Sequence, residues 1–342
     1  MSSARRRAAY LRLRPGATVY EISTDELQIS FPNYTATFTS PAVTKGVAAI
    51  VRAIGTGATR ASVVRRAALA TGLDGEVIEY LLESMLSSNC LLVGTREQAD
   101  TPLREFHAYL GGASEDLDQR LNDARCILVQ PEGDPGGLVE ALAQIEVQVD
   151  VITPTPGTSS AATLGELAER LDSATVIGCW NVPYRSPFAR AINETALRHA
   201  VPTLFGTCEG IVGRVGPFVL PGNTACLECL NDRLLSLAGG PELRAYRAYR
   251  LRNEDLVPEP WPSHPLFVRA VAALFGVELV QVALRRPSVA SGGFVEYRVA
   301  DARAERHPVL RVPGCSACRP QSARRLAWDV RLQAPAVKGS AG

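Results

Sequence analysis

Two pairs of cysteines, each with two residues between its members, are the strongest chemical signal in the sequence. The pairs are Cys226-Leu-Glu-Cys229 and Cys315-Ser-Ala-Cys318, and 85 residues separate them. Each pair offers two thiolates at the spacing that a tight turn needs to hold one metal ion. Two such pairs make the four-sulfur tetrahedral site typical of structural zinc. The sequence therefore predicts that Cys226, Cys229, Cys315 and Cys318 bind one Zn²⁺ ion and join two distant parts of one domain.

Two other interpretations of these pairs are weaker. A thioredoxin-type redox motif uses one pair after a strand rather than two. Disulfides are uncommon in the cytoplasm, where we expect this protein, because the basic start of the chain lacks the apolar stretch of a signal peptide. A closed four-thiolate site has no open position for water, so the expected role of the zinc is structural. The other cysteines stand among apolar neighbours and are expected to be buried free thiols: Cys90, Cys126, Cys179 and Cys208.

Composition narrows the class of protein. A length of 342 residues allows about two domains, and an apolar content of 46% is enough for a core in each. The formal net charge of +1 gives no reason to expect nucleic acid or an anionic membrane as a partner. No uninterrupted apolar run approaches the length of a membrane span, so we expect no transmembrane helix.

The first 95 residues have their own order of elements. Strands are predicted where apolar and polar residues alternate, and helices where apolar residues recur at helical spacing before a glycine. Three strands precede three helices, and a short strand closes the unit: 18–22, 26–31, 34–39, 43–54, 60–71, 76–87 and 89–93. This order indicates a small winged-helix-like domain over residues 1–95.

From residue 124 the pattern changes to strands that alternate with helices. The predicted strands are 125–129, 148–152, 174–178, 201–205, 294–299 and 307–312, with a hairpin over 211–219. The predicted helices are 136–145, 164–171, 186–199 and 267–284. Such alternation implies a mostly parallel sheet with right-handed crossovers. We therefore expect a polar connector over 96–123, an α/β domain over 124–330 and a flexible tail over 331–342.

The sequence around the cysteines resembles a known family. A predicted strand and hairpin lead into Pro221-Gly-Asn-Thr-Ala-Cys-Leu-Glu-Cys229, and His307-Pro-Val-Leu-Arg-Val-Pro-Gly-Cys-Ser-Ala-Cys318 leads into the second pair. Both segments resemble the zinc knuckles of the E1-like, ThiF-like adenylating fold. More narrowly, residues 15–325 resemble the E1-like (ocin-ThiF-like) partner proteins of YcaO-type azoline cyclodehydratases. The N-terminal unit is similar to the peptide-recognition element of these proteins.

This resemblance implies a fold, a function and partners. The fold would be a Rossmann-like E1/ThiF-type sheet with a structural zinc, preceded by a RiPP recognition element that binds the leader of a precursor peptide. The protein would not be an enzyme by itself. It would deliver a ribosomally made peptide to a YcaO-type cyclodehydratase, which converts Cys, Ser or Thr to azolines in the biosynthesis of bacteriocin- or thiopeptide-type antibiotics. E1-like folds are often dimeric, and the apolar helix 267–284 is suited to a homodimer interface.

The loop that would hold a nucleotide departs from the pattern of active E1-like proteins. These carry Gly-x-Gly-x-x-Gly after their first strand, where backbone N–H groups cradle phosphate. Here the loop is Gln130-Pro-Glu-Gly-Asp-Pro-Gly-Gly137, with two acids and two prolines. Thr153-Pro-Thr-Pro156 stands where active relatives carry acids for the ribose, and Asn181 stands near their metal-binding aspartate. We expect no bound ATP, because acids repel a triphosphate and a neutral amide cannot hold Mg²⁺ as a carboxylate does.

One cysteine could in principle act as a nucleophile. Some E1 enzymes use a cysteine to take the activated carbonyl group, and Cys208 lies in a Gly-Thr-Cys-Glu-Gly segment. The neighbouring Glu209 is expected to raise the pKa of this thiol and so to suppress the reactive thiolate. We therefore expect Cys208 to be a packed small residue.

A peptide-binding groove is predicted between the third strand and the third helix of the N-terminal unit. An extended peptide could pair with an exposed strand edge, while helix residues at i, i+3, i+4 and i+7 form the other wall. The predicted contacts are Tyr34, Thr35, Ala36, Thr37, Phe38, Thr39, Val77, Tyr80, Leu81 and Ser84. The same apolar stripe would also fit an ordinary core helix. Basic residues of the second helix could meet acidic leader residues or simply face water: Arg60, Arg65 and Arg66.

Two further classes of protein remain as alternatives. One is an active ATP-dependent adenylating enzyme that acts on the carboxyl end of a peptide or carrier. The other is a winged-helix nucleic-acid binder, since three helices beside strands also describe such domains. The second is disfavoured because the third helix carries Glu76, Glu79 and Glu83, which would repel phosphates.

Overall fold

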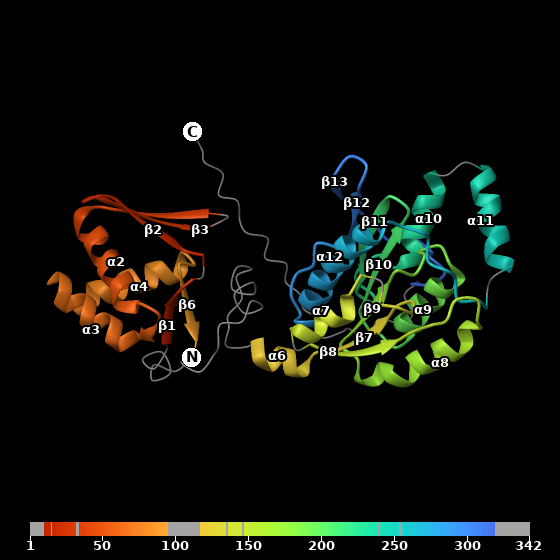
Figure 1. The fold of residues 1–342 in the computed structure, drawn as a ribbon, viewed down its shortest axis with the longest axis horizontal. Coiled ribbons are helices and arrows are strands. Elements are labelled where there is room, and N and C mark those ends of the chain that lie inside the picture. The colour runs from red at the N-terminus through yellow and green to blue at the C-terminus, as the bar shows by residue number, and fades with distance from the viewer. Residues whose placement is uncertain are drawn as a thin grey trace. The chain divides into compact units, whose positions relative to one another are not determined.

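The chain forms two compact units, Met1–Gln119 and Arg120–Gly342, in a computed structural model (Figure 1). The structure describes residues 10–14, 16–31, 34–94, 117–134, 136–145, 147–237, 240–252 and 255–318. Most of the predicted connector 96–123 and all of the predicted tail 331–342 lie outside these residues, as does the end of the predicted α/β domain. Each unit is described by itself below.

The first unit combines a three-stranded sheet with three helices. Strands β2 (Thr18–Ser23), β3 (Glu26–Phe31) and β4 (Tyr34–Thr39) pair antiparallel in the order β2-β3-β4. Helices α2 (Pro41–Ile54), α3 (Arg60–Thr71) and α4 (Gly75–Ser87) follow. A second small sheet has the order β5-β1-β6, with strands β1 (Tyr10–Leu13), β5 (Ala58–Thr59) and β6 (Leu91–Gly94).

The ends of the helices in this unit follow from local chemistry. The Thr59 hydroxyl accepts the Ser62 N–H at the start of α3, and the carboxylate of Asp74 accepts the Glu76 N–H at the start of α4. Gly72 ends α3 in the left-handed conformation, with φ 72°, where a glycine carries no Cβ penalty. These signals explain why the predicted helices 60–71 and 76–87 agree closely with the observed α3 and α4.

The second unit contains a seven-stranded sheet with the order β13-β12-β11-β10-β9-β7-β8. Four strands are mutually parallel: β7 (Arg125–Val129), β8 (Gln148–Ile152), β9 (Val176–Trp180) and β10 (Thr203–Glu209). The other three continue antiparallel from β10: β11 (Val212–Val219), β12 (Gly293–Arg298) and β13 (Arg303–Pro308). The predicted α/β class and its parallel strands are therefore confirmed.

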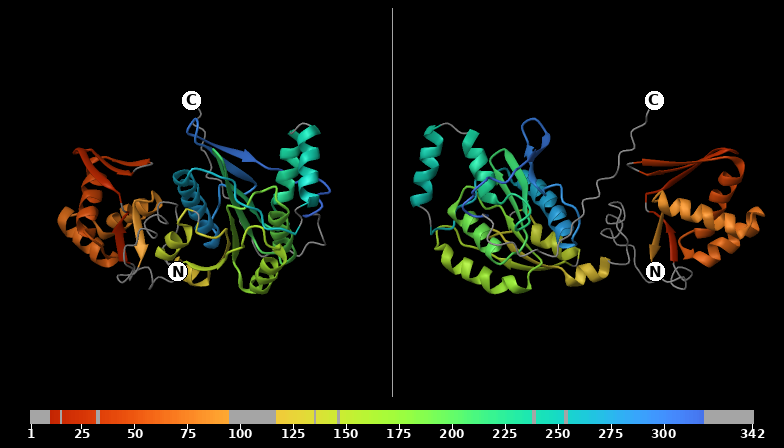
Figure 2. Two further views of the ribbon diagram at one scale, coloured as in Figure 1. Left: turned by 45° about the vertical axis from the view of Figure 1, so that its right-hand side comes forward. Right: turned by 180° about the vertical axis from the view of Figure 1, so that it is seen from behind.

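Helices cover both faces of this sheet (Figures 1 and 2). Helices α7 (Leu138–Gln144) and α12 (Pro265–Ala283) lie on one face, and α8 (Ser160–Arg170), α9 (Pro187–Arg198) and α10 (Leu227–Leu237) lie on the other. Alternate residues of the central strands point to opposite faces, as the twofold period of a strand requires. Gly206 faces α12, where an added Cβ would lie 2.4 Å from the Phe275 ring.

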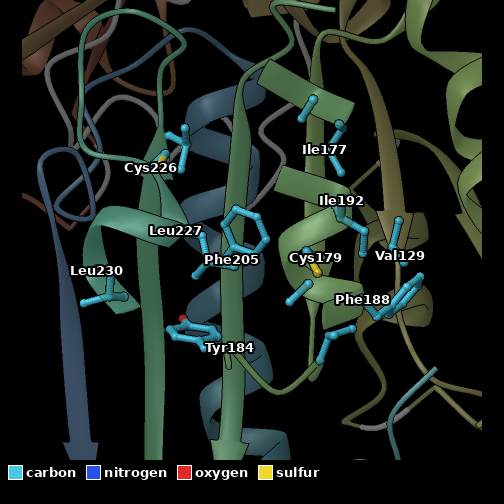
Figure 3. Packing of buried hydrophobic residues seen from close by; sticks show 14 of the residues in the cluster. Val129, Ile177, Cys179, Tyr184, Phe188, Ile192, Phe205, Cys226, Leu227 and Leu230 are labelled. Carbon is cyan, nitrogen blue, oxygen red and sulfur yellow. The ribbon is translucent and has the colours of Figure 1, made fainter. Parts of the chain in front are cut away.

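The larger core of the second unit lies between the sheet and helices α8, α9 and α10 (Figure 3). It includes Ile177 and Cys179 of β9, Phe188 of α9 and Phe205 of β10, all at most 1% exposed. Cys226 of the first cysteine pair belongs to the same cluster. The metal-binding knuckle is therefore continuous with the hydrophobic core and not an appendage of it.

Helix α12 was predicted from its apolar sequence, and it is long and apolar enough to cross a membrane by length and composition alone. Among the described residues it is the one helix that meets this test, and 50% of its most apolar window is buried inside the protein. Val271, Phe275 and Leu279 pack towards the sheet and are at most 1% exposed. This burial is that of the core helix of a doubly wound sheet.

Helices α10 and α11 (Gly240–Arg252) are not among the helices predicted from the sequence. One late strand has bounds that differ from the predicted ones. The segment predicted as a strand over 307–312 is observed as β13 at Arg303–Pro308, because a tight hairpin pairs Arg298 of β12 with Arg303. Charged residues on an edge strand hide the usual alternation from a sequence pattern. Residues 309–312 instead form an irregular approach to the second cysteine pair.

Candidate functional site

Four cysteine sulfurs converge on one point of the second unit. Cys226 Sγ lies 3.8 Å from Cys229 Sγ and 3.8 Å from Cys315 Sγ, and Cys229 Sγ lies 3.5 Å from Cys318 Sγ. All four ligand atoms lie within 4.8 Å of one another. Sulfurs at the corners of a tetrahedron about 2.3 Å from one zinc ion would lie about 3.8 Å apart. The cluster therefore fits the predicted four-thiolate zinc site.

The first cysteine pair stands at the start of a helix. Gly222 adopts φ 83° in the turn after β11, and the Thr224 hydroxyl accepts the Leu220 N–H and donates to the Phe218 carbonyl. These bonds fix the turn that carries Cys226, and α10 then places Cys229 one turn further on. The Pro-Gly-x-Thr-x-Cys-x-x-Cys sequence is thus explained residue by residue.

The second cysteine pair follows β13 in a turn. Gly314 has φ 75°, and the Cys315 N–H bonds to the Val312 carbonyl 3.1 Å away. The Val312 N–H in turn donates to Cys229 Sγ at 3.3 Å, so the backbone of one knuckle contacts a ligand of the other. Cys226, Cys229 and Cys315 are buried, whereas Cys318 is half-buried.

The electrostatics of the cluster favour a thiolate at Cys229. A hydrogen bond from Cys226 lowers the pKa of Cys229 far below its ordinary value, and the same bond raises the pKa of Cys226. Burial raises the pKa of Cys315 to about 11. Cys226 and Cys315, whose pKa values are raised, would give up their protons when a metal cation binds. The donor set is all sulfur, which suits zinc and gives no position at which water could be activated.

The loop after β7 supplies a side-chain acceptor for a backbone N–H group at the start of the helix that follows it. The Asp134 carboxylate accepts the Val139 N–H in the first turn of α7 at 3.1 Å, and it also accepts the Gln130 side-chain amide at 3.1 Å. The next residues pass close to α12, where a Cβ at Gly136 would lie 2.4 Å from the Ala272 side chain. An internal carboxylate therefore stands where a phosphate-binding loop would offer free backbone donors.

The other two positions compared with active E1-like proteins are also committed to the fold. Asn181 is 5% exposed at the end of β9, and its side-chain oxygen accepts the Cys208 N–H at 3.2 Å. After β8, the predicted ribose segment 153–156 leads into a stretch whose backbone pairs with the later chain: Gly157 with Val257, and Ser160 with Asp255. The Asn181 side chain and the backbone N–H groups of Gly157 and Ser160 are thus used in hydrogen bonds within the fold.

Cys208 has the surroundings of a packed thiol. It is 1% exposed on β10, and burial first and Glu209 second raise its pKa to about 12. A nucleophilic cysteine needs a lowered pKa and access to its substrate. The expected role of Cys208 as a packed residue agrees with both features.

In the first unit, β4 is an edge strand. It pairs with β3 from Tyr34↔Phe31 to Thr39↔Glu26, and among the described strands it has no partner on its other side. Phe38 is buried, Tyr34 and Ala36 are half-buried, and the three threonines of the strand are exposed. The outer edge of β4, which pairs with no other described strand, is the edge at which the sequence analysis places an added peptide strand.

Helix α4 presents the four predicted contact residues in two groups. Tyr80 is 73% exposed and Val77 is 42% exposed, and Ser84 is half-buried. Leu81 is 3% exposed and belongs to the core, where an added Cβ at Gly46 of α2 would lie 2.3 Å from its side chain. Leu81 therefore packs α4 against α2 and presents little surface to a ligand.

Two acidic residues of α4, Glu79 and Glu83, are paired with an arginine of α3. Arg60 of α3 donates to the Glu79 carboxylate through Nε at 2.8 Å and Nη2 at 2.5 Å, and to Glu83 at 2.6 Å. The Arg60 side chain is 13% exposed, so it is neither a solvated surface charge nor free to meet an acidic leader. Arg66 donates to the Ala53 carbonyl, and Arg65 is exposed.

One end of β4 is tied to the end of α4 by Tyr34, which the sequence analysis named, and by Arg14, which it missed. The Tyr34 hydroxyl donates to the Asn89 carbonyl at 2.7 Å, and Arg14 Nη1 donates to the Tyr34 oxygen at 3.3 Å. Arg14 is 2% exposed and lies 5.9 Å from the ring centres of Phe31 and Tyr34. No local sequence pattern predicts that an arginine at the end of a strand will contact Tyr34 in this way.

Comparisons with known proteins agree on the fold. The chain is similar to the heterocyclase TruD, with 19% identity over 91% of this chain and a TM-score of 0.69. A heterocyclase in complex with substrate and cofactor is 20% identical over 91% of this chain, with a TM-score of 0.66. Escherichia coli MccB with AMPCPP and MccA gives 11% identity over 90% of this chain and 99% of MccB, with a TM-score of 0.63.

These likenesses define the class of fold. The structure has the E1-like, ThiF-like fold of MccB and TruD, with a four-cysteine cluster that fits zinc. The chain spans 43% and 39% of the lengths of the two heterocyclases, so it corresponds to less than half of each. No protein-family model and no curated protein matches the sequence.

Proposed function

We propose that this protein binds the leader of a ribosomally made precursor peptide and delivers the peptide to a YcaO-type cyclodehydratase. Residues 1–95 would act as a RiPP recognition element, and Cys, Ser or Thr residues of the delivered peptide would be converted to azolines by the partner. The observation that carries the proposal is the outer edge of β4, which has no partner among the described strands, together with the uncharged, exposed side chains of Val77 and Tyr80 on α4. An extended peptide can add to such an edge, with its side chains against the helix.

The structural likenesses support this proposal. One neighbour is a heterocyclase in complex with substrate and cofactor, and another is described as the microcin C7 biosynthetic enzyme MccB in complex with N-formylated MccA. Heterocyclisation is the reaction that we assign to the partner enzyme. MccB is bound to N-formylated MccA and has a fold similar to that of this chain. Holding the leader raises the effective concentration of the rest of the peptide at the partner enzyme.

The second unit supports a role in docking more than in adenylation. Asp134 fills the helix start after β7, and Asn181 is held in a buried bond to β10. The zinc would brace this unit without taking part in chemistry. We further propose a cytoplasmic protein, and the exposed apolar side chains of α12, Leu266, Leu274 and Val277, are the surface on which we place a homodimer contact.

Leader binding tests the proposal directly. The probe is a fluorescently labelled leader peptide from a short reading frame beside this gene, titrated with the full chain and followed by anisotropy. Val77→Asp should weaken binding at least about tenfold, because it places a charge against the bound strand. Leu69→Asp is the matched control, since Leu69 is 80% exposed on α3 and away from β4. Absence of binding by the unsubstituted chain would count against the function.

The adenylating alternative has its own assay. Exchange of labelled pyrophosphate into ATP, dependent on this protein and a peptide with a free carboxyl end, would show an active E1-like enzyme. We expect no exchange above background. Azoline formation by the YcaO-type enzyme should instead rise when this chain is added, and this rise should vanish with a leaderless peptide.

A further inference from the structure

Five hydrogen bonds hold the two cysteine knuckles in place without using a metal, and four of them run from one knuckle to the other. Arg311 precedes the second pair, and its two terminal nitrogens reach in different directions: Nη1 donates to the Gly222 carbonyl at 2.7 Å and Nη2 to the Cys318 carbonyl at 2.9 Å. Gly222 belongs to the turn that delivers the first pair. One guanidinium group therefore spans both knuckles, although Gly222 and Arg311 are 89 positions apart in the sequence.

A second arginine repeats the connection from the other side. Arg233 lies on α10, one turn after Cys229, and donates through Nε to the Leu310 carbonyl at 2.6 Å and through Nη2 to the Arg311 carbonyl at 3.2 Å. The fifth bond is the Val312 N–H to Cys229 Sγ, at 3.3 Å. The side chains of Arg233 and Arg311 thus connect the segment 310–312 to the first knuckle by hydrogen bonds.

The charge of the site gives these arginines a second effect. Four thiolates around one Zn²⁺ ion carry a net charge of −2, which is costly next to a hydrophobic core. Two guanidinium groups within the knuckles offset part of that charge. The planar fork of arginine also serves the two carbonyls from two separate nitrogens, whereas a lysine would have to serve both from its single nitrogen.

From this arrangement we infer that Arg311, assisted by Arg233, is the positioning residue of the metal site. It brings the second cysteine pair to the first before the ion binds, so that zinc enters a nearly assembled site. Groups that orient metal ligands without touching the metal commonly change metal affinity by about 10- to 100-fold. The assignment concerns the affinity for zinc and is independent of the proposed peptide-binding function.

Zinc release from the full chain tests the inference. Zinc-loaded protein is mixed with excess chromogenic chelator, and the rate at which the coloured complex appears is measured. Arg311→Ala should release zinc about tenfold faster or more. Arg306→Ala is the matched control, because Arg306 also donates to two backbone carbonyls, those of Val289 and Ser291, but outside the knuckles. It should release zinc at the parental rate.

Two more variants keep the test decisive. Arg311→Lys retains the charge without the two-directional fork and should also release zinc faster than the parent. Arg233→Ala, which acts from α10, should accelerate release even if Arg311→Ala fails to fold, and circular dichroism identifies that case. Parental release rates in folded Arg311→Ala, or in Arg233→Ala, would overturn the assignment. A parental zinc-release rate in Arg311→Lys would show that the planar guanidinium group is not required.

Discussion

The cysteine knuckles and the β4–α4 face are built in opposite ways. The knuckles consist of four identical reactive groups that face inward, three of them buried, and nearby backbone groups are bonded around them. The β4–α4 face consists of the outer edge of β4, which pairs with no other described strand, and of exposed, uncharged side chains of α4 such as Tyr80 and Val77. A knuckle residue should therefore affect the stability of the fold, whereas a residue of the face should affect binding and little else.

The largest effect is expected at the knuckles. Cys226→Ser removes one of four ligands, so we expect zinc to fall from about one ion per chain to near none. The unfolding free energy should drop by several kcal/mol, out of the roughly 10–16 kcal/mol that structural zinc provides in small peptides. Metal analysis and thermal unfolding measure both. Cys126→Ser is the control, because Cys126 is buried on β7 outside the cluster and its variant should keep zinc. A folded, metal-free Cys226→Ser protein of parental stability would refute the structural role.

The face should respond in the opposite manner. Tyr80→Ala should weaken leader binding by about 2 kcal/mol, roughly thirtyfold, as an exposed aromatic anchor does. Its thermal unfolding should stay within a degree or two of the parent, about 0.5 kcal/mol, because the side chain is 73% exposed. Leu69→Ala should leave both measurements unchanged. A large loss of stability in Tyr80→Ala, with binding retained, would make this residue part of the fold and not of the face.

The loop after β7 provides a smaller test within the second unit. Asp134→Ala removes the acceptor of the Val139 N–H and of the Gln130 amide, so the unfolding free energy should fall by about 1 kcal/mol. ATP binding, followed by calorimetry, should remain absent. Glu132→Ala, in the same loop and exposed, should have no effect. Tight ATP binding by the unsubstituted chain would show that the loop accepts a nucleotide despite Asp134.

The smallest effect is expected at the scattered cysteines. Burial raises the pKa of Cys90 to about 11 and those of Cys126 and Cys208 to about 12, with Glu209 adding to the rise at Cys208. At pH 7.5 their thiolate fraction is then on the order of one in a thousand or less. Iodoacetamide should leave these three unmodified in the zinc-loaded protein and label all eight cysteines after denaturation. Rapid labelling of Cys208 in the native protein would reopen a nucleophilic role.

Much of the fold could be predicted because local chemistry and tertiary structure agree. Helix α3 begins at a threonine cap and ends at a left-handed Gly72, and β3 alternates half-buried and buried residues as a strand with one buried face should. Strand β5 has two residues and is defined by its pairing with β1, which no local sequence pattern predicts. Strand β13 is placed by its hairpin with β12 against a charged sequence.

The candidate sites divide in the same way. The spacing of each cysteine pair was enough to identify its chemistry, because two thiolates three residues apart can bind one ion whatever surrounds them. The groove residues could be proposed from helical spacing alone, but that spacing cannot separate a core residue from an exposed one. Leu81 and Tyr80 are neighbours in sequence, yet one is 3% and the other 73% exposed.

The sequence by itself thus determined the four cysteines of the cluster, the class of the second unit and the order of its parallel strands along the chain, since these depend on residue type and short-range periodicity. Tertiary structure alone decided which charged groups act at a distance. Arg60 is neutralised by two glutamates of the next helix, Asp134 caps a helix, and Arg311 joins turns that lie 89 residues apart. Contacts between residues so far apart depend on how whole elements pack, and no local pattern encodes them.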